Sequence, residues 1–234
     1  MPLSVTWLGH STFHLGLPSG KHVVFDPWLG NPNCPPAWSK PEALKPLDLI
    51  LVTHGHSDHI DDLIPVARES GATVVGMFEL CTWLATKGIT NTAPMNKGGG
   101  LDIAGLRITM VDARHSAGYM DNGTMVYMGE PNGFVVKLED GMVIYIAGDT
   151  SIFGDMRLIG EIYQPEIAFL PIGDRFTMGP DTAARACEML GVRQVVPIHW
   201  GTFPLLTGTP DVLKALVEPK GVQVLQLAPG ETTE

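Results

Sequence analysis

The chain has 234 residues, 44% of them hydrophobic and 17% charged, and its formal net charge is −10 at pH 7. This length suits one large core, so we expect a single domain spanning residues 1–234. No apolar run approaches the roughly 20 residues of a membrane-spanning helix, and the N-terminal segment lacks the pattern of an export signal. The acidic balance argues against polyanions as partners. These features predict a cytoplasmic protein without membrane or nucleic-acid partners, and they leave a homo-oligomer open.

Short apolar runs bounded by Gly, Pro, Asp or Asn recur along the chain, and their length and β-branched content predict strands. In chain order these strands are expected at 5–8, 23–25, 49–52, 73–75, 106–111, 133–138, 142–147, 167–172, 194–198 and 222–227. Helical spacing is found at 61–70, 78–87, 180–190 and 210–216. Segments 31–41 and 92–100 are rich in Gly and Pro and are expected to be surface loops. The alternation predicts an α/β protein with helices covering its sheets.

A strand followed by Asp and a strand followed by His each occur twice, as HVVFDPW and LILVTH and again as MVIYIAGDT and QVVPIHW. Such a repeat is what an internal duplication leaves. Apolar strands that end in polar loops are also common in any α/β protein. The pattern alone leaves the two explanations evenly matched.

The segment THGHSDHIDD at 53–62 directly follows the apolar run LILV. His54 and His56, two residues apart in an extended turn, can point the same way and bind one cation, while Asp58 and His59 face a second position. The alternative is an ordinary polar surface loop. Imidazole and carboxylate ligands suit zinc, manganese, iron or nickel, and the absence of cysteine ligands disfavours a closed structural zinc site. We therefore expect an open, catalytic metal site.

Three further apolar runs each end near a potential ligand, namely His115, Asp149 and His199. Taken singly, each histidine is more often an ordinary loop or core residue, and Asp149 suits a turn or a helix cap. Ligands in α/β sheets commonly bind at the carboxyl ends of the strands. Beside the first motif, these residues are better explained as additional metal ligands.

The combination of His-x-His-x-Asp-His with a later His, an Asp and a final His resembles the metallo-β-lactamase fold superfamily. The segments WLGHSTF, FDPW, PIGDRFTMGP and PIHWGTFP are also similar to the UPF0173-like metal-dependent hydrolases related to the L-ascorbate-6-phosphate lactonases. The resemblance covers nearly the whole chain. It implies a four-layer αββα sandwich with a dinuclear site at one edge. One metal would be bound by His54, His56 and His115, the other by Asp58, His59 and His199, with Asp149 between them.

The resemblance implies a hydrolase with two divalent ions, zinc first among them, whose bridging hydroxide attacks a small-molecule ester, lactone, amide or phosphoester. Asp58 would also orient or deprotonate the attacking water. Two alternatives stay open on the same scaffold. One is a phosphodiesterase or nuclease, which charge and size disfavour. The other is an iron-dependent oxidoreductase, which His56 disfavours because di-iron flavin-linked relatives place an acidic residue there.

His10 and Asp26 lie at transitions from strand to loop in the N-terminal half. Asp26 is a candidate acceptor for the free ring N–H of a metal-bound histidine, and His10 is a candidate substrate contact. For both residues, a purely structural role in a turn is an equal alternative. Asp174 and Thr177 in GDRFTMG are weaker candidates for the substrate pocket, and we do not expect them to be catalytic.

Overall fold

The computed structural model describes residues 2–233, which divide into two compact units. Within these residues, unit 1 comprises 2–96, 116–131 and 227–233, and unit 2 comprises 97–115 and 132–226. Among the described residues, no helix combines the length and the apolar character needed to cross a bilayer.

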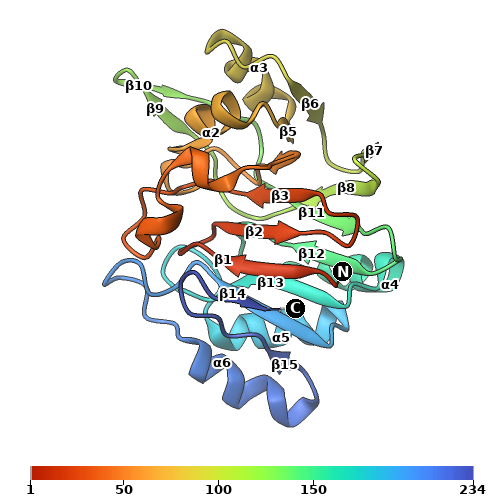
Figure 1. Cartoon of the computed structure of the whole chain (residues 1–234). Helices are drawn as coiled ribbons and strands as arrows, with labels where there is room; N and C mark the ends of the chain where they lie inside the picture. The colour runs from red at the N-terminus through yellow and green to blue at the C-terminus, as the bar shows by residue number, and fades with distance from the viewer. Residues whose placement is uncertain (1, 234) are drawn as a thin grey trace. The chain divides into compact units, whose positions relative to one another are not determined.

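In the described part of unit 1, seven strands form a mixed sheet in the order β16-β1-β2-β3-β4-β5-β6. The strands β16, β1, β2 and β3 pair antiparallel, whereas β3, β4, β5 and β6 run parallel. A separate hairpin is formed by β9 and β10. Figure 1 labels β1, β2, β3, β5, β6, β9 and β10. The bounds of the strands of unit 1 are β1 Ser4–Trp7, β2 Phe13–Gly16, β3 His22–Phe25, β4 Leu49–Leu51, β5 Thr73–Met77, β6 Thr92–Met95, β9 Tyr119–Asp121, β10 Thr124–Val126 and β16 Thr232–Thr233.

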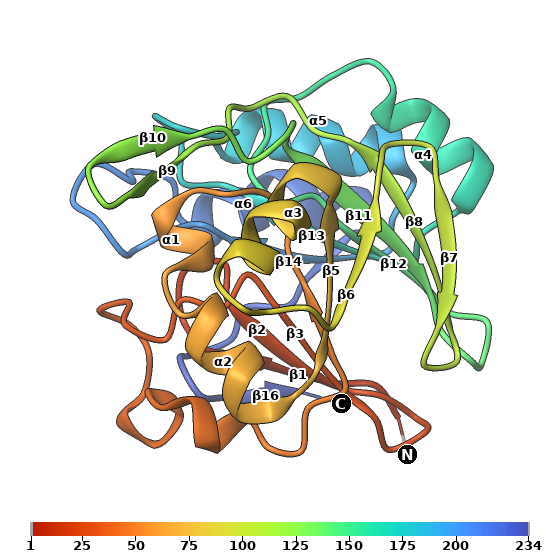
Figure 2. The ribbon, with the colours of Figure 1, turned by 90° about the horizontal axis from the view of Figure 1, so that it is seen from above.

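Three α-helices of unit 1 connect its parallel strands: α1 Ser57–Ile60, α2 Leu63–Ser70 and α3 Phe78–Thr86. Figure 2 shows them on one side of the unit 1 sheet. α2 turns Leu63, Val66 and Ala67 inward and ends at Gly71, whose positive φ of 70° closes the last turn. Two short 3₁₀ helices, η1 Pro36–Trp38 and η2 Pro41–Leu44, lie in the connection between β3 and β4.

Unit 2, all of whose residues are described, has a seven-stranded mixed sheet in the order β15-β14-β13-β12-β11-β8-β7. β12 to β15 run parallel, and β12, β11, β8 and β7 pair antiparallel. Unit 2 thus repeats the scheme of unit 1, an antiparallel set followed by a parallel set. The bounds are β7 Gly100–Ile103, β8 Leu106–Asp112, β11 Asn132–Lys137, β12 Val143–Ile146, β13 Ile167–Pro171, β14 Gln194–Ile198 and β15 Gln223–Val224.

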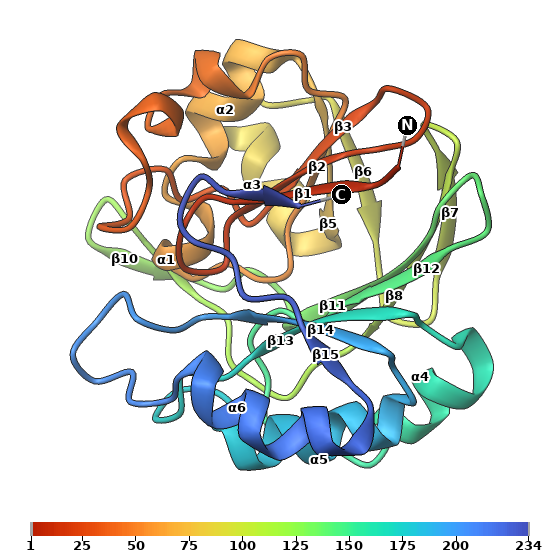
Figure 3. The ribbon, with the colours of Figure 1, turned by 60° about the horizontal axis from the view of Figure 1, so that its bottom comes forward.

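The helices of unit 2 are α4 Met156–Tyr163, α5 Pro180–Leu190 and α6 Pro210–Val217, followed by the 3₁₀ turn η3 Glu218–Lys220. Figure 3 shows α4, α5 and α6 along one face of the parallel strands. Their apolar sides pack on Tyr145, Ala168 and Leu170, which are fully buried. α5 begins with proline in its first turn and ends at Gly191 in the left-handed region, the usual arrangement of these two residues.

The predicted strands and helices are confirmed, with bounds shifted by a few residues. The strands and α-helices not predicted are the strands β2, β6, β7, β9, β10 and β16 and the helices α1 and α4. The longest of them is α4, whose sequence MRLIGEIY contains a glycine in its interior. A Cβ at Gly160 would lie 2.7 Å from the carbonyl oxygens of Met189 and Leu190 at the end of α5. Glycine is therefore needed for the close approach of α4 to α5, and it weakens the helical signal in the sequence.

The prediction of a loop at 92–100 is wrong for its first part, because Thr92–Met95 forms β6. β6 pairs only with β5 and is an edge strand of the described sheet. An edge strand tolerates Pro94, because one side of its backbone needs no ladder hydrogen bonds. Pro94, which indicated a loop, is thus compatible with a strand because β6 lies at the edge of the sheet.

Candidate metal centre

The predicted ligands are divided between the two units. His54, His56, Asp58 and His59 lie in unit 1, together with His10 and Asp26, whereas His115, Asp149 and His199 lie in unit 2. In both units these residues follow the carboxyl ends of strands, as predicted: β1, β3 and β4 in unit 1 and β8, β12 and β14 in unit 2.

Three of these residues have a left-handed backbone, with φ of 52° at His10, 49° at Asp26 and 55° at His199. Non-glycine residues adopt this conformation at a small energetic cost, and it recurs at functional sites. Each of the three stands at the first sharp turn after a strand.

The histidine motif itself spans the end of β4 and the short helix α1. His56 precedes α1, while Asp58 and His59 belong to the helix, with Asp58 in its first turn. Gly55 separates the two histidines, and a Cβ there would lie 2.4 Å from Cβ and Cγ of Met128. Met128 is buried directly against this backbone, so the spacer between the histidines has to be glycine.

Asp26 is the hydrogen-bonding centre of unit 1. Its Oδ1 accepts the backbone N–H of Thr53 at 2.8 Å, and its Oδ2 accepts the Thr53 hydroxyl at 2.7 Å. The same Oδ2 lies 2.9 Å from Nδ1 of His59. All three residues are 1% exposed or less. A buried carboxylate with several donors is the arrangement that stabilises its charge away from water.

These contacts determine the tautomers of two histidines. Because the Asp26 carboxylate only accepts, His59 donates from Nδ1, and its Nε2 keeps the lone pair. The Thr53 hydroxyl gives its proton to Asp26, so it accepts from Nδ1 of His54, 3.1 Å away. His54 therefore also presents Nε2 as a lone pair. A single carboxylate prepares both imidazoles as ligands, as acceptors beyond the ligand shell commonly do.

His56 directs its Nδ1 towards Nε2 of His54 at a distance of 3.0 Å. Its own Nε2 lies 3.4 Å from the hydroxyl oxygen of Ser116. Bonds of about 2.0–2.1 Å to a tetrahedral zinc ion separate two ligand nitrogens by roughly 3.3 Å. The pair of nitrogens thus has nearly the separation that a shared divalent cation requires.

His10 is completely buried, and its Nε2 lies 3.2 Å from Oδ2 of Asp58. The ring meets the edge of Trp28 at a centroid distance of 5.2 Å. Ligand atoms of His10, Asp58 and His59 all lie within 4.8 Å of one another. His10 therefore contacts a predicted ligand, and its predicted contact with substrate stays a prediction.

In unit 2 the corresponding centre is Asp149. Its Oδ2 lies 3.0 Å from Nε2 of His199 and 3.5 Å from Nε2 of His115. Asp149 and His199 are each 2% exposed, whereas His115 is partly exposed. One carboxylate oxygen shared by two imidazole nitrogens is a donor set that suits a divalent metal ion. Within each unit, then, the residues present fit the metal that the sequence predicts.

Several residues that support these sets were not predicted from the sequence. Thr53 links Asp26 to His54, and its position directly before the motif is the one signal that could have identified it. Thr150, next to Asp149, accepts the backbone N–H of Arg114 at 2.9 Å and so ties the end of β12 to the end of β8. Ser116 and Met128 are far from the motif in sequence and carry no signal.

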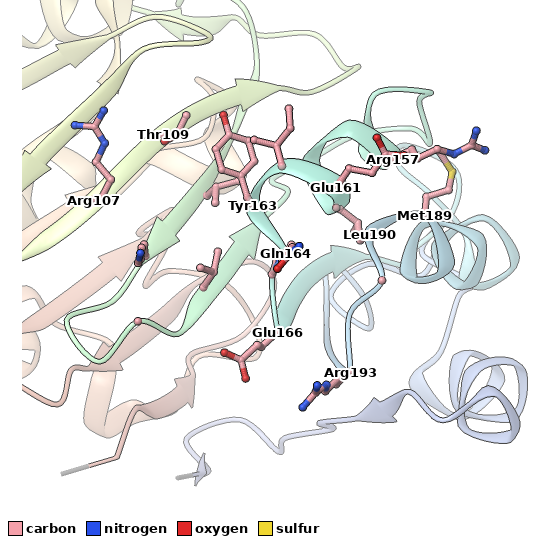
Figure 4. A pocket seen from close by; sticks show the side chains of 18 of the residues that line it. Arg107, Thr109, Arg157, Glu161, Tyr163, Gln164, Glu166, Met189, Leu190 and Arg193 are labelled. Carbon is pink, nitrogen blue, oxygen red and sulfur yellow. The ribbon is translucent and has the colours of Figure 1, made fainter.

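A large hollow in unit 2 lies elsewhere, between α4, the end of α5 and the strands β8 and β11, with a volume of about 1370 Å³. Five Lys and Arg residues and three Glu residues line it, and Figure 4 shows Arg107, Arg157 and Arg193 on separate sides. α4 and α5 both end here, and helix C-termini favour cations. The three Glu residues and the C-termini of α4 and α5 thereby balance the charge of the basic residues. None of the nine predicted site residues, all of which the structure describes, lines this hollow.

Comparisons with known proteins show the family to which the chain belongs. Residues 21–200 match the family described as the beta-lactamase superfamily domain. UPF0173 metal-dependent hydrolases from Rubrobacter xylanophilus and Roseiflexus sp. are 48% and 45% identical, over 97% and 98% of this chain and 94% and 96% of theirs. The structure of the metallo hydrolase Igni18 from Ignicoccus hospitalis has a TM-score of 0.88 and 34% identity, covering 99% of this chain and 97% of that one.

The fold is therefore that of the metallo-β-lactamases, and the predicted α/β class is confirmed, each unit supplying one mixed sheet with its helices. The chain belongs to the UPF0173 metal-dependent hydrolase family of the β-lactamase superfamily. The predicted class of activity, metal-dependent hydrolysis, is confirmed with it.

Proposed function

We propose that this protein hydrolyses a small-molecule ester, lactone, amide or phosphoester with two divalent cations, zinc in the native enzyme. In this proposal His54, His56 and His115 bind one cation, Asp58, His59 and His199 bind the other, and Asp149 bridges them. The assignment follows the order of ligands in the sequence, and the contacts within each unit support it. When bound, the cations supply hydroxide near neutral pH and polarise the oxygen of the scissile group.

The observation that carries the proposal is the preparation of His54 and His59 by Asp26. Through Thr53 and directly, the carboxylate of Asp26 holds both rings with the Nε2 lone pair available. A structural histidine pair would need no common acceptor that sets both tautomers. Fixed imidazoles bind a cation without reorganisation, as a catalytic metal site requires.

Asp58 is placed to hold or move a proton. Its side chain is 24% exposed, and its Oδ2 contacts the buried Nε2 of His10 at 3.2 Å. His10 keeps the carboxylate in one orientation, while its exposed side remains accessible to water. We propose that Asp58 orients the attacking water and accepts its proton, in addition to binding metal.

A panel of lactones, acyl esters, amides and phosphodiesters, assayed with Zn²⁺ or Mn²⁺, tests the activity. We expect hydrolysis of at least one small-molecule class and none of nucleic acid. Failure of every substrate in the metal-loaded protein, with consumption of oxygen instead, would contradict hydrolysis and favour the oxidoreductase.

The role of Asp58 is tested by Asp58→Asn. We expect turnover to fall by about 10²–10⁴-fold, the usual range for a general base, with a much smaller loss of bound metal by elemental analysis. Asp61→Asn is the matched control, because Asp61 lies in the same segment and is not a predicted ligand. Unchanged turnover in Asp58→Asn would overturn the assignment.

A further inference from the structure

The loop that follows β13, residues 173–178, occupies in unit 2 the position that the histidine motif occupies in unit 1. In unit 1, β4 is the first parallel neighbour of the last antiparallel strand, β3, and the motif follows β4. In unit 2, β13 is the first parallel neighbour of β12. Its sequence, GDRFTM, contains no histidine. Carboxyl ends of parallel strands are where α/β proteins bind ligands.

This loop lies between two segments that carry predicted ligands, one with Asp149 and one with His199, and it contacts the backbone of both. At its end, the N–H of Met178 donates to the carbonyl oxygen of Thr150, next to Asp149, at 3.0 Å. At its start, a Cβ on Gly173 would lie 2.1 Å from the carbonyl oxygen of His199. The loop is thus held between the ends of β12 and β14. Both ends of the loop are thus anchored to the backbone of the segments that carry Asp149 and His199.

Arg175, in the middle of the loop, is exposed and lies over Phe176, with 5.9 Å between its guanidinium carbon and the ring centroid. Within residues 2–233, no carboxylate forms an ion pair with it. Asp174 and Arg175 are both left-handed, with φ of 64° and 57°. Hydrogen bonds from the N–H groups of Phe176 and Thr177 to the carbonyl oxygen of Asp174 fix this turn.

Arg175 is also the one available cation at this edge of the unit 2 sheet. The loops after β12, β13 and β14 cover residues 147–155, 172–179 and 199–209, and they contain no other Lys or Arg. After β8 there is Arg114, whose Nε is bound by Asp112 at 2.9 Å. Lys97, which precedes β7 at the same edge, also pairs with Asp112, at 2.5 Å. Of these cations, Arg175 is therefore the one without an ion pair among the described residues.

We propose that Arg175 determines specificity by binding a carboxylate group of the substrate remote from the scissile bond. The planar guanidinium matches a carboxylate in two parallel hydrogen bonds, and one arginine balances its single charge. The substrate class is then a carboxylated ester, lactone or amide. This inference rests on the proposed hydrolytic function, because it names the substrate of that same site.

Two lactones that differ by one carboxylate test the inference: γ-butyrolactone and 5-oxotetrahydrofuran-2-carboxylate. Wild-type enzyme should prefer the carboxylated lactone by at least about 10-fold in kcat/KM. Arg175→Gln should abolish this preference by raising KM about 10- to 100-fold for the carboxylated lactone, with kcat nearly unchanged and no effect on γ-butyrolactone. Arg175→Lys should retain part of the preference, because lysine keeps the charge and loses the paired hydrogen bonds.

Calorimetry of the hydrolysis products gives a readout independent of turnover. 2-Hydroxyglutarate carries one carboxylate more than 4-hydroxybutyrate, and only its affinity should fall, about 10-fold or more, in Arg175→Gln. Arg157→Gln is the matched control, since Arg157 is exposed, lies on α4 in the same unit and should change neither affinity.

The possible failures are distinguishable. If wild type hydrolyses both lactones equally and Arg175→Gln changes nothing, the role of Arg175 is overturned and hydrolysis stands. If neither lactone is a substrate, equal or absent binding of the two products also overturns it. Failure of the whole substrate panel in the metal-loaded protein instead overturns the proposed function itself.

Discussion

At the scale of single residues, Asp26 links the backbone of unit 1 to the predicted metal ligands His54 and His59. It accepts two hydrogen bonds from Thr53 and one from His59, and it is 1% exposed. A buried carboxylate with three donors is a stable arrangement only while all of them are present. Asp26 therefore contributes to stability and to the preparation of two imidazoles at once.

Asp26→Asn should show both contributions. The amide replaces one acceptor oxygen with a donor that faces another donor, so the free energy of unfolding should fall by about 1–3 kcal/mol in urea. Affinity for Zn²⁺, measured by competition with a chelator, should fall about 10–100-fold. Asp48→Asn is the control, because Asp48 is exposed and accepts a single backbone N–H, from His22 at 2.8 Å. Equal zinc affinity in wild type and Asp26→Asn would refute the role of Asp26.

Sequence spacing could indicate His54, His56, Asp58 and His59 because they lie within six residues. Asp26 could also be predicted as a hydrogen-bond acceptor, because an Asp before Pro at the end of a strand can be recognised in the sequence alone. Asp26 and the His59 ring that it contacts are 33 residues apart in the chain. Their contact depends on the directions of the two side chains in the fold, which cannot be read from the sequence. The link through Thr53 is a geometric fact of the same kind.

At the scale of elements, β2 and β3 bring two histidines together away from the predicted ligands. His14 on β2 stacks on His22 of β3 with ring centroids 5.1 Å apart, and it meets Trp38 at 5.4 Å. Burial, and next the neighbouring His22, lower the pKa of His14 from 6.5 to about 4. Neutral His14 thus belongs to the packing of these two strands.

This lowered pKa predicts acid sensitivity. Unfolded His14 takes up a proton below about pH 6.5 and folded His14 only near pH 4, so His14 should reduce stability as the pH falls through this window. The reduction is about 2 kcal/mol at pH 5. His14→Phe and His14→Gln should both remove it, as seen in the change in free energy of unfolding between pH 7.5 and 5. The same change in wild type and both variants would exclude His14 as its source.

The elements themselves were predictable where the apolar pattern is unbroken, as in β4, β13 and α5. α4 was not, because Gly160 is there for contact with α5 rather than for the helix itself. β6 was not, because the acceptability of Pro94 depends on which strand is at the edge. In both cases a tertiary neighbour overrides the local signal.

At the scale of the whole molecule, both units follow the same scheme of antiparallel strands, parallel strands and covering helices. The strand-then-Asp pair falls on corresponding places, since Asp26 follows β3 and Asp149 follows the equivalent strand β12. The strand-then-His pair does not, because His54 follows β4 and His199 follows β14, the equivalent of β5. The shared strand scheme and the two Asp residues favour internal duplication, and the histidines add nothing to that argument. The class of fold was predictable from motif order and element alternation, whereas the division into units needed the contacts between strands.

We propose that the chain binds two divalent cations, and the metal content of the purified protein measures this number. Protein dialysed against metal-free buffer is analysed by mass spectrometry for metal and by amino-acid analysis for protein. We expect two divalent ions per chain, mainly zinc. A content of one ion or fewer, with no second ion taken up when Zn²⁺ is titrated in, would contradict it.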